Sequence, residues 1–157
     1  MKKQSVTLTN GELIDCVNAL SALLESKPVL GILQGFPLEQ NIRVMQLEAT
    51  EVWNARNGII EKHTKKGEDG KSLTAKVLRL DGSGKPKLDA DGNAIVIGEK
   101  YVFSSPDAQV EAEKEISDLN GIQTNLDLYR LPFDSFLVFG EQPISWNSLK
   151  PIIEVEV

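Results

Sequence analysis

Hydrophobic side chains recur along the start of the chain with two different spacings. The segment from Ser5 to Thr9 alternates and is β-branched, so we expect a short strand. Thr9 and Glu12 have the spacing of a helix capping box, and apolar residues follow at helical intervals, at Leu13, Val17, Leu20 and Leu24. The pattern therefore predicts a strand over residues 5–9 and a helix over residues 11–25.

A second helical pattern follows an apolar connector, KPVLGILQGFP (residues 27–37), which we expect to pack against the protein. From Leu38 to about Lys65 no proline intervenes. One face of this stretch is apolar, with Leu38, Ile42, Met45, Ala49, Val52 and Ile59 or Ile60. We expect a long helix here, with an end weakened by Gly58 and a tail that frays into a polar loop.

The next segment, residues 73–103, carries β-favouring side chains between polar turns. Asp-Gly is a strong signal for a tight hairpin turn, and three such pairs punctuate the region: Asp69-Gly70, Asp81-Gly82 and Asp91-Gly92. The pattern predicts a β-hairpin or a three-stranded meander. The spacing of the three pairs does not predict a sequence repeat.

A third helix is predicted after the hairpin. Ser105, Pro106 and Asp107 are an N-cap, a first-turn proline and a first-turn acid, and Asn120-Gly121 suits a C-cap. Its inner stripe is Ala108, Ala112, Ile116 and Leu119. Beyond it, residues 122–131 are predicted to be extended, PFDSFLVFG (132–140) to be a strand or loop, and SWNSLKPII (145–153) to be a short helix capped by Ser145.

These elements predict one α+β domain over residues 1–157, in which three main helices pack with a small antiparallel sheet or hairpin. Its parts are strand, helix and long helix over 5–66, a β-hairpin over 72–103, and helix, strand and short terminal helix over 105–157. The length suits a single hydrophobic core, and 41% apolar with 25% charged residues is typical of a globular protein.

The net charge of −6 is unevenly distributed. Residues 1–60 carry 5 basic and 6 acidic side chains, residues 61–87 carry 8 and 4, and residues 88–157 carry 4 and 13. The acidic balance argues against direct nucleic-acid binding, which requires clustered Lys and Arg. The basic stretch could contact an anionic surface locally or be a solvated loop.

The single cysteine, Cys16, excludes an internal disulfide and a multi-cysteine zinc site, and its apolar neighbours predict a buried structural thiol. The first residues carry two lysines with no apolar run behind them. No stretch approaches 18 uninterrupted apolar residues, so we expect neither a signal peptide nor a membrane span.

Two glycine-containing stretches resemble ligand-binding loops, but their residues do not have the spacing that the calcium-binding and phosphate-binding motifs require. In LDADGN (residues 88–93), an EF-hand loop that began at Asp89 would need glycine at its sixth position and glutamate at its twelfth, where Ala94 and Lys100 stand. GSGKPK (residues 82–87) lacks both the first glycine and the final Ser or Thr of a phosphate-binding P-loop. Both stretches are predicted to be hairpin turns.

No catalytic, cofactor-binding or metal-binding site is predicted. The only histidine, His63, stands at the predicted fraying end of the long helix, where we expect it to be exposed and idle. The alternative is a carboxylate-dependent enzyme that acts through Glu48 and Glu51, which are three residues apart on that helix. Acidic residues that are merely solvated on a helix have the same pattern.

Two groups of residues are candidates for binding a partner. The first group is aromatic and lies near the C-terminus; it contains Phe133, Phe136, Phe139 and Trp146. These side chains could belong either to the hydrophobic core or to a surface that binds a partner. The second is an acidic face on the third predicted helix, containing Glu111, Glu113, Glu115 and Asp118. Such a face could imitate phosphates in a basic groove.

The order of features resembles a family of small tailed-bacteriophage proteins of unknown activity. The resemblance rests on VTLTNGELIDCVNALSAL, NIRVMQLEATEVWNARNGIIEKH, DADGNAIVIGEKYVF, EAEKEISDLNG and ISWNSLKPII. It implies a phage-encoded protein that acts in the host bacterial cytoplasm or the virion, and it carries over no catalytic residue. With the residues above, it favours a non-enzymatic protein that contacts a phage protein, a host protein or its own copies during virion assembly. The alternative is an inhibitor of a host defence system.

Overall fold

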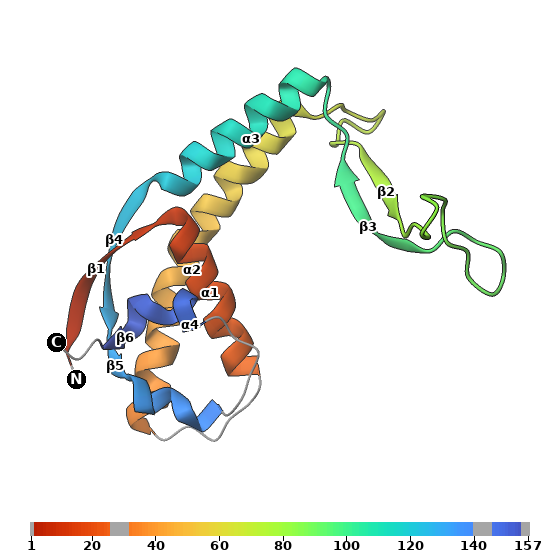
Figure 1. Cartoon of the computed structure of the whole chain (residues 1–157). Helices are drawn as coiled ribbons and strands as arrows, with labels where there is room; N and C mark the ends of the chain where they lie inside the picture. The colour runs from red at the N-terminus through yellow and green to blue at the C-terminus, as the bar shows by residue number, and fades with distance from the viewer. Residues whose placement is uncertain (1, 26–31, 140–145, 155–157) are drawn as a thin grey trace. The chain divides into compact units, whose positions relative to one another are not determined.

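The computed structural model of the chain describes residues 2–25, 32–139 and 146–154, with the side chains of residues 32–34 and 137–139 left out of the description. The architecture is α+β, as predicted (Figure 1). In chain order the elements are β1 (Lys3–Thr9), α1 (Asn10–Glu25), α2 (Ile32–His63), β2 (Thr74–Leu78), β3 (Val96–Tyr101), α3 (Pro106–Gly121), β4 (Gln123–Tyr129), β5 (Leu131–Pro132), the 3₁₀ helix η1 (Phe133–Phe139), α4 (Trp146–Leu149), the 3₁₀ helix η2 (Lys150–Ile152) and β6 (Ile153–Glu154).

The chain forms two compact units, to which α2 and α3 each contribute residues. The first, the core unit, consists of residues 1–55 and 117–157. The second, the hairpin unit, consists of residues 56–116. The assignment of residues 1–157 to a single domain stays a prediction.

The core unit is built on β1 and β4, which pair antiparallel from Lys3↔Tyr129 to Thr9↔Gln123 without a register shift. Side chains alternate between the two faces of such a pair, so every second residue faces the core. Val6 and Leu8 of β1 are buried in this way, as are Leu126 and Leu128 of β4. The alternation read from residues 5–9 is therefore confirmed.

Helices α1 and α2 supply most of the remaining core. Their buried apolar side chains are Leu13, Cys16, Val17, Leu20 and Leu23 on α1, and Leu38, Met45, Ala49 and Val52 on α2. The C-terminal segment adds Leu131, Phe136, Leu149 and Ile152. Burial of one leucine or phenylalanine side chain contributes about 1.5–3 kcal/mol, so this cluster is the main source of stability in the core unit.

The predicted N-terminal caps of α1 and α3 are confirmed. At α1, the Thr9 N–H donates to Glu12 Oε2 (2.8 Å) and the Glu12 N–H donates to Thr9 Oγ1 (3.2 Å), which is the reciprocal pattern of a capping box. The hydrogen bond from the Thr9 backbone holds the pKa of Glu12 below its usual value. At α3, the Ala108 N–H donates to Ser105 Oγ (3.0 Å).

The C-terminus of α3 differs from the prediction. Gly121 is the last helical residue, and it does not adopt the left-handed conformation of a C-capping glycine. Asn10 takes over the capping role, because its Nδ2 donates to the Leu119 carbonyl (2.9 Å) and its N–H donates to the Ile122 carbonyl (2.8 Å). One carbonyl of the last helical turn, that of Leu119, is thus bonded by a residue distant in sequence, and it also accepts from the Ile122 N–H (3.2 Å).

The start predicted for the long helix was wrong. Helix α2 begins at Ile32, so Pro37 lies inside it and not before it. Pro37 is the sixth residue of α2, so its missing N–H costs the helix one backbone hydrogen bond, and the residue is buried. Residues 27–31 of the predicted connector lie outside the described residues.

The prediction of a strand or loop over residues 132–140 was also wrong for most of this segment. Leu131 and Pro132 form β5, which pairs in parallel with β6, and residues Phe133–Phe139 form a 3₁₀ helix. Phe136 is fully buried and fixes this helix to the core. Helix α4 confirms the short terminal helix from Trp146, while its predicted cap, Ser145, lies outside the described residues.

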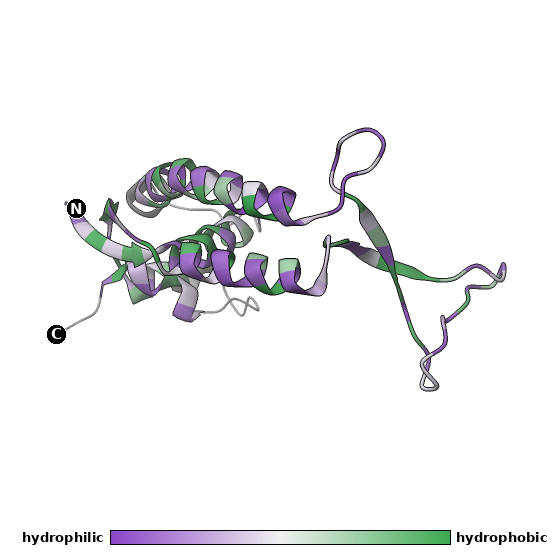
Figure 2. Ribbon diagram, turned by 90° about the horizontal axis from the view of Figure 1, so that it is seen from above, coloured by the Kyte–Doolittle hydropathy of each residue, from purple (hydrophilic) through white to green (hydrophobic). Residues whose placement is uncertain are grey.

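In the hairpin unit, β2 and β3 pair antiparallel from Thr74↔Tyr101 to Leu78↔Val96, with a register shift between Val77 and Leu78. The predicted hairpin is thus confirmed. Figure 2 shows hydrophobic residues along these two strands, and the sheet carries Val96 and Ile97 exposed at 46% and 62%.

Candidate functional site

Three short arms extend the β2–β3 ladder into a branched structure. The arms are residues 66–72, 80–86 and 88–94, and each is closed by one antiparallel bridge: Lys66↔Ser72, Leu80↔Pro86 and Leu88↔Ala94. We call residues 64–103, which contain the ladder and the arms, the branched hairpin. The arms are the first, second and third arm in chain order.

The three arms share one turn. In each arm the N–H of the second residue donates to the carbonyl of the sixth, and the N–H of the fifth donates to the carbonyl of the second. The fifth residue is glycine, with φ between +75° and +83°. These glycines are Gly70, Gly84 and Gly92. The turn residue of the second arm is therefore Gly84, and the prediction that Asp81-Gly82 forms the turn pair was wrong.

Aspartate side chains hold the second and third turns closed. Asp81 Oδ1 accepts from the N–H groups of Ser83 (2.8 Å) and Lys85 (3.0 Å). Asp89 Oδ1 accepts from those of Asp91 (3.0 Å) and Asn93 (2.8 Å). The Ser83 hydroxyl also donates to Asp81 and is the first cause of its lowered pKa. These carboxylates thus stabilise the turns, in agreement with the prediction that LDADGN forms a hairpin turn.

A ring of three backbone hydrogen bonds joins the second and third arms to the ladder. Arg79 N–H donates to the Ile95 carbonyl (2.8 Å), Ile95 N–H to the Lys87 carbonyl (2.9 Å), and Lys87 N–H to the Arg79 carbonyl (2.7 Å). A second ring of the same kind joins the first arm to the other end of the ladder; its members are Lys65, Leu73 and Val102. The rings satisfy backbone groups where three chain segments meet.

The sequence of the second and third arms is a repeat of eight residues. RLDGSGKP (79–86) and KLDADGNA (87–94) share a basic residue, leucine, aspartate and the turn glycine at the same positions. The next repeat position is Ile95, which closes the ring. The interpretation that this region contains no repeat was wrong, because the spacing was measured between Asp-Gly pairs that do not occupy equivalent positions.

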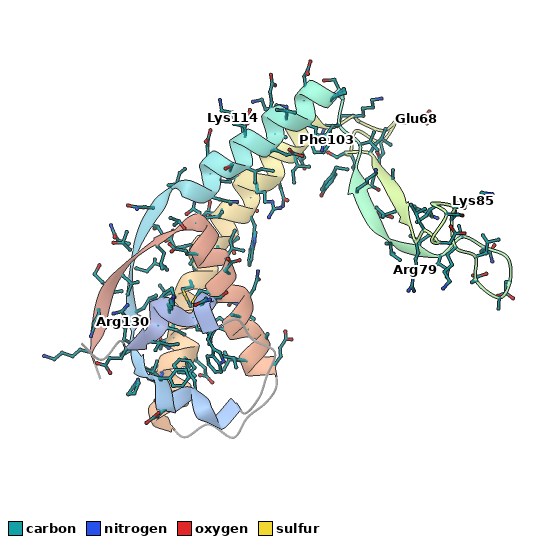
Figure 3. The ribbon with its side chains drawn as sticks, in the orientation of Figure 1. Glu68, Arg79, Lys85, Phe103, Lys114 and Arg130 are labelled. Atoms are coloured by element: carbon teal, nitrogen blue, oxygen red, sulfur yellow. The ribbon has the colours of Figure 1, made fainter. Side chains whose placement is uncertain are left out.

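The branched hairpin has no hydrophobic core of its own. All residues from Lys65 to Glu111 are described, and none of them is buried. Large apolar side chains remain exposed, among them Leu80 at 58% and Leu88 at 56%, which occupy equivalent positions of the repeat. Arg79 and Lys85, labelled in Figure 3, belong to the same region. The surface thus combines exposed leucines with basic side chains.

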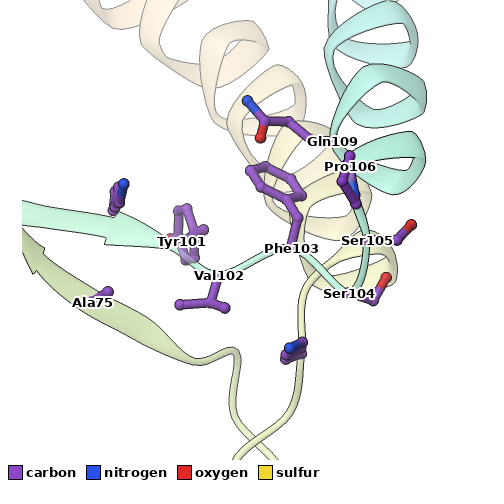
Figure 4. A pocket seen from close by; sticks show the side chains of 10 residues that line it. Ala75, Tyr101, Val102, Phe103, Ser104, Ser105, Pro106 and Gln109 are labelled. Atoms are coloured by element: carbon purple, nitrogen blue, oxygen red, sulfur yellow. The ribbon is translucent and has the colours of Figure 1, made fainter.

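A cavity of about 790 Å³ is lined by Lys65, by residues of β2 and β3, by the segment 102–105 that follows β3, and by the first turn of α3 (Figure 4). Tyr101 and Phe103 contribute aromatic rings, Lys65 and Lys100 contribute amines, and Gln109 contributes an amide. The cavity offers apolar contact and hydrogen-bond donors to a partner side chain, and it contains no carboxylate, histidine or cysteine among its lining residues.

His63 is buried, so its predicted exposure was wrong. Its side chain is 6% exposed, and Nε2 lies 3.0 Å from Glu115 Oε1, with Glu111 Oε2 at 3.9 Å from Nδ1. Lys62 Nζ donates to the same Glu115 oxygen (2.6 Å) and is the first cause of the lowered pKa of Glu115, followed by His63. The His63 carbonyl accepts from both the N–H and the hydroxyl of Ser104, each at 3.0 Å.

This cluster fixes the end of α2 to α3 within the hairpin unit. His63 and Glu115 are 52 residues apart in the chain, and no spacing in the sequence indicated that they meet. Within the described residues, no group of three or more His, Cys, Asp or Glu side chains is placed to hold a metal ion. The Lys62–Glu115 ion pair and the contact between His63 and Glu115 anchor the end of α2, which leads into the branched hairpin.

The aromatic candidates divide between core and surface. Phe136 is buried, Phe133 is 46% exposed, and Trp146 is half-buried between them, with ring centroids 5.5 Å from Phe133 and 6.3 Å from Phe136. The side chain of Phe139 lies outside the described residues. Phe136 thus belongs to the core, which leaves Phe133 as the exposed member of the group.

The acidic candidates all lie on α3, where Glu111, Glu113 and Asp118 are exposed. Glu115 is half-buried and held by Lys62 and His63. Glu113 Oε1 accepts from Gln109 Nε2 (2.8 Å). Glu48 and Glu51, the carboxylates of the enzyme alternative, are exposed side chains of α2.

In comparisons with models of known protein families, with curated proteins and with solved structures, no match is found. In the parts of the chain that the structure describes, no helix combines the length and apolar character needed to span a bilayer.

Proposed function

We propose that the protein is a non-enzymatic binding protein that uses its branched hairpin to contact another protein. The observation that supports this proposal is the absence of any buried residue from Lys65 to Glu111, a fully described stretch that nevertheless exposes Leu73, Leu80, Leu88, Val96, Ile97 and Tyr101. Apolar surface that a chain does not bury itself is typical of an interaction site.

The way in which the branched hairpin is stabilised supports the same proposal. A hydrophobic core normally holds a β-structure together, and a lone two-stranded hairpin is only marginally stable in water. Here glycine turns, aspartate caps and two hydrogen-bonded rings fix the backbone. The leucines therefore remain available for a partner.

The partner that this surface suits is a protein with an apolar patch and nearby carboxylates. The apolar patch would cover Leu80 and Leu88, and the carboxylates would pair with the lysines of the ladder, of the first arm and of the hydrogen-bonded ring that joins them. Those lysines are Lys65, Lys66, Lys71, Lys76 and Lys100. We place this contact in an infected bacterial cell, and the resemblance to small phage proteins makes a virion or assembly protein the first partner to test.

The test is affinity purification of the tagged full chain from infected cells, with and without Leu80→Asp and Leu88→Asp. We expect one protein to co-purify in stoichiometric amount and to be lost in the double variant, because two buried charges would oppose binding. Leu47→Asp on α2 is the matched control, since Leu47 is 68% exposed and lies outside the branched hairpin. Mass spectrometry of purified particles shows whether the complex enters the virion. Retention of the partner by the double variant would contradict the proposal.

A further inference from the structure

Strand β1 forms one edge of the sheet in the core unit. Among the described residues, its sheet contains two strands, β1 and β4 (Figure 1). The outer edge of β4 is occupied at Tyr129, whose N–H and carbonyl both hydrogen-bond to the side chain of Asn41. On the outer edge of β1, Thr9 is the described residue whose backbone is engaged, by the carboxylate of Glu12 (2.8 Å).

The same bonds show which backbone groups of β1 face outward. In an antiparallel pair, residues alternate between exchanging two hydrogen bonds and exchanging none. Because Tyr129 bonds to Asn41, its opposite residue Lys3 belongs to a pair without ladder bonds. Alternation then places Ser5 and Thr7 in such pairs too, so their N–H and carbonyl groups point away from β4.

Two further hydrogen bonds give the same alternation. The Thr9 N–H, which should also point outward, donates to the carboxylate of Glu12 (2.8 Å). The Asn10 N–H, which should point toward the opposite chain segment, donates to the Ile122 carbonyl (2.8 Å). The outward-facing backbone groups of Ser5 and Thr7 thus form a short row that a further strand could bind.

We propose that the free edge of β1 binds β1 of a second copy of this protein, antiparallel and across a two-fold axis at Val6. Ser5 then lies opposite Thr7 of the second copy, and Thr7 opposite Ser5. Each pair exchanges two backbone hydrogen bonds. The result is a continuous four-stranded antiparallel sheet, with the buried faces of both copies on the same side.

The sequence of β1 fits its own copy for reasons of charge and shape. Natural edge strands are protected from pairing by Lys, Pro, a bulge or inward charges. The one charged residue of β1, Lys3, stands at the start of the strand and away from Val6, while residues 4–9 contain no charged residue and no proline, and the pairing with β4 has no bulge. The chain carries a net charge of −6, so two copies meet most easily at an uncharged segment. Ser5 and Thr7 are exposed, and Ser–Thr pairs stabilise neighbouring strands.

The first experiment measures the mass of the full chain by light scattering after gel filtration, over a range of concentrations. We expect the wild-type protein to approach twice its 17.3 kDa, and Thr7→Pro to remain a monomer. Proline removes an outward N–H without breaking a backbone bond to β4, so the variant should keep its fold. The hydrogen bond from Thr7 Oγ1 to Asn125 Oδ1 (2.6 Å) is lost in this variant and equally in the valine control below. Thr7→Val, which keeps the N–H, is the matched control and should dimerise. Thr7→Lys places two like charges near the two-fold axis and should also remain a monomer. It replaces the proline variant as the test if that variant does not fold.

The second experiment measures amide hydrogen exchange of Ser5 and Thr7. We expect exchange at both amides to slow by about tenfold or more as the protein concentration rises, because these amides are free in the monomer. A monomer at the highest soluble concentration overturns the proposal, and so does a dimer that persists in both Thr7→Pro and Thr7→Lys. An added peptide that protects the two amides in a monomer would instead assign the edge to another protein. Leu80→Asp should leave the dimer intact, which separates this proposal from that for the branched hairpin.

Discussion

The side-chain amide of Asn41 pairs with the backbone of Tyr129 as a neighbouring strand would. Asn41 Nδ2 donates to the Tyr129 carbonyl (2.7 Å), and the Tyr129 N–H donates to Asn41 Oδ1 (2.8 Å). Asn41 is 1% exposed, so both bonds are protected from water. This single residue fixes α2 to the edge of β4 in the core unit.

Replacing Asn41 by leucine should destabilise the core unit by about 2–4 kcal/mol. The variant leaves the N–H and the carbonyl of Tyr129 buried without partners, and each unsatisfied group costs about 1–3 kcal/mol. Urea denaturation measures the free energy of unfolding. Gln46→Leu changes an exposed amide of the same helix and should shift that free energy by less than about 0.5 kcal/mol. Equal effects of the two variants would contradict the role given to Asn41.

Replacing Gly84 by alanine should destabilise the second arm by about 1–2 kcal/mol. Gly84 has φ of +80°, a conformation that costs an L-residue about this much, although no neighbouring atom would contact the added Cβ. Gly82→Ala is the control, because Gly82 has no positive φ and should tolerate the methyl group. NMR chemical shifts of residues 80–86 report the loss of the turn. A larger change in Gly82→Ala would favour the Asp81-Gly82 turn that the sequence first indicated.

Glu115 should make the stability of the hairpin unit depend on acid pH. Its folded pKa is lowered by Lys62 and then by His63, so the ionised form is favoured in the folded state. The stabilisation is complete above the ordinary pKa of 4.5 and is lost as the pH falls through the lowered folded value.

Unfolding of the hairpin unit, followed by NMR in urea from pH 7 to pH 3, should therefore show a decline below about pH 4.5 that Glu115→Gln flattens. Glu113→Gln, an exposed acid on the same helix, should retain the decline. An unchanged pH profile in Glu115→Gln would mean that other carboxylates cause it.

Cys16 should be unreactive in the folded protein. Burial, with a smaller contribution from Asp15, raises the pKa of its thiol to about 12, so the thiolate required for reaction with a disulfide reagent is scarce. At pH 8 we expect slow release of thionitrobenzoate from the native chain and rapid release in urea.

Above pH 9.0 the unfolded state releases the thiol proton of Cys16 more readily than the folded state does, so the free energy of unfolding should fall with rising pH, and Cys16→Ala should remove that part of the decline. Fast labelling of the native chain would contradict the buried position.

The confirmed predictions depend on interactions between residues that are close in the sequence. The capping box at Thr9 and Glu12 and the cap at Ser105 depend on residues three apart, so the sequence alone contains all the atoms involved. The alternating residues of β1 and the helical stripe of α1 are similarly local patterns; they identified Val6, Leu8, Leu13, Val17 and Leu20 of the core, while Leu24 of the stripe is only partly buried.

Predictions failed where a local signal could be outweighed by a distant contact. Proline normally marks a helix boundary, yet Pro37 lies within α2, where it is buried. A histidine next to lysines on a polar helix end should be solvated, yet His63 is covered and paired with Glu115. The eight-residue repeat was visible in the sequence and was missed because Asp-Gly pairs, and not equivalent positions, were compared.

Neighbouring residues alone specify the strand β1, helix α1 and the N-caps of α1 and α3, because backbone conformation depends largely on local sequence. Tertiary structure decided which polar groups are buried and what they bond to. Asn41 and Tyr129 are 88 residues apart, and His63 and Glu115 are 52 apart. The need to satisfy buried hydrogen-bonding groups selects such partners only once the chain has folded, so no local pattern records them.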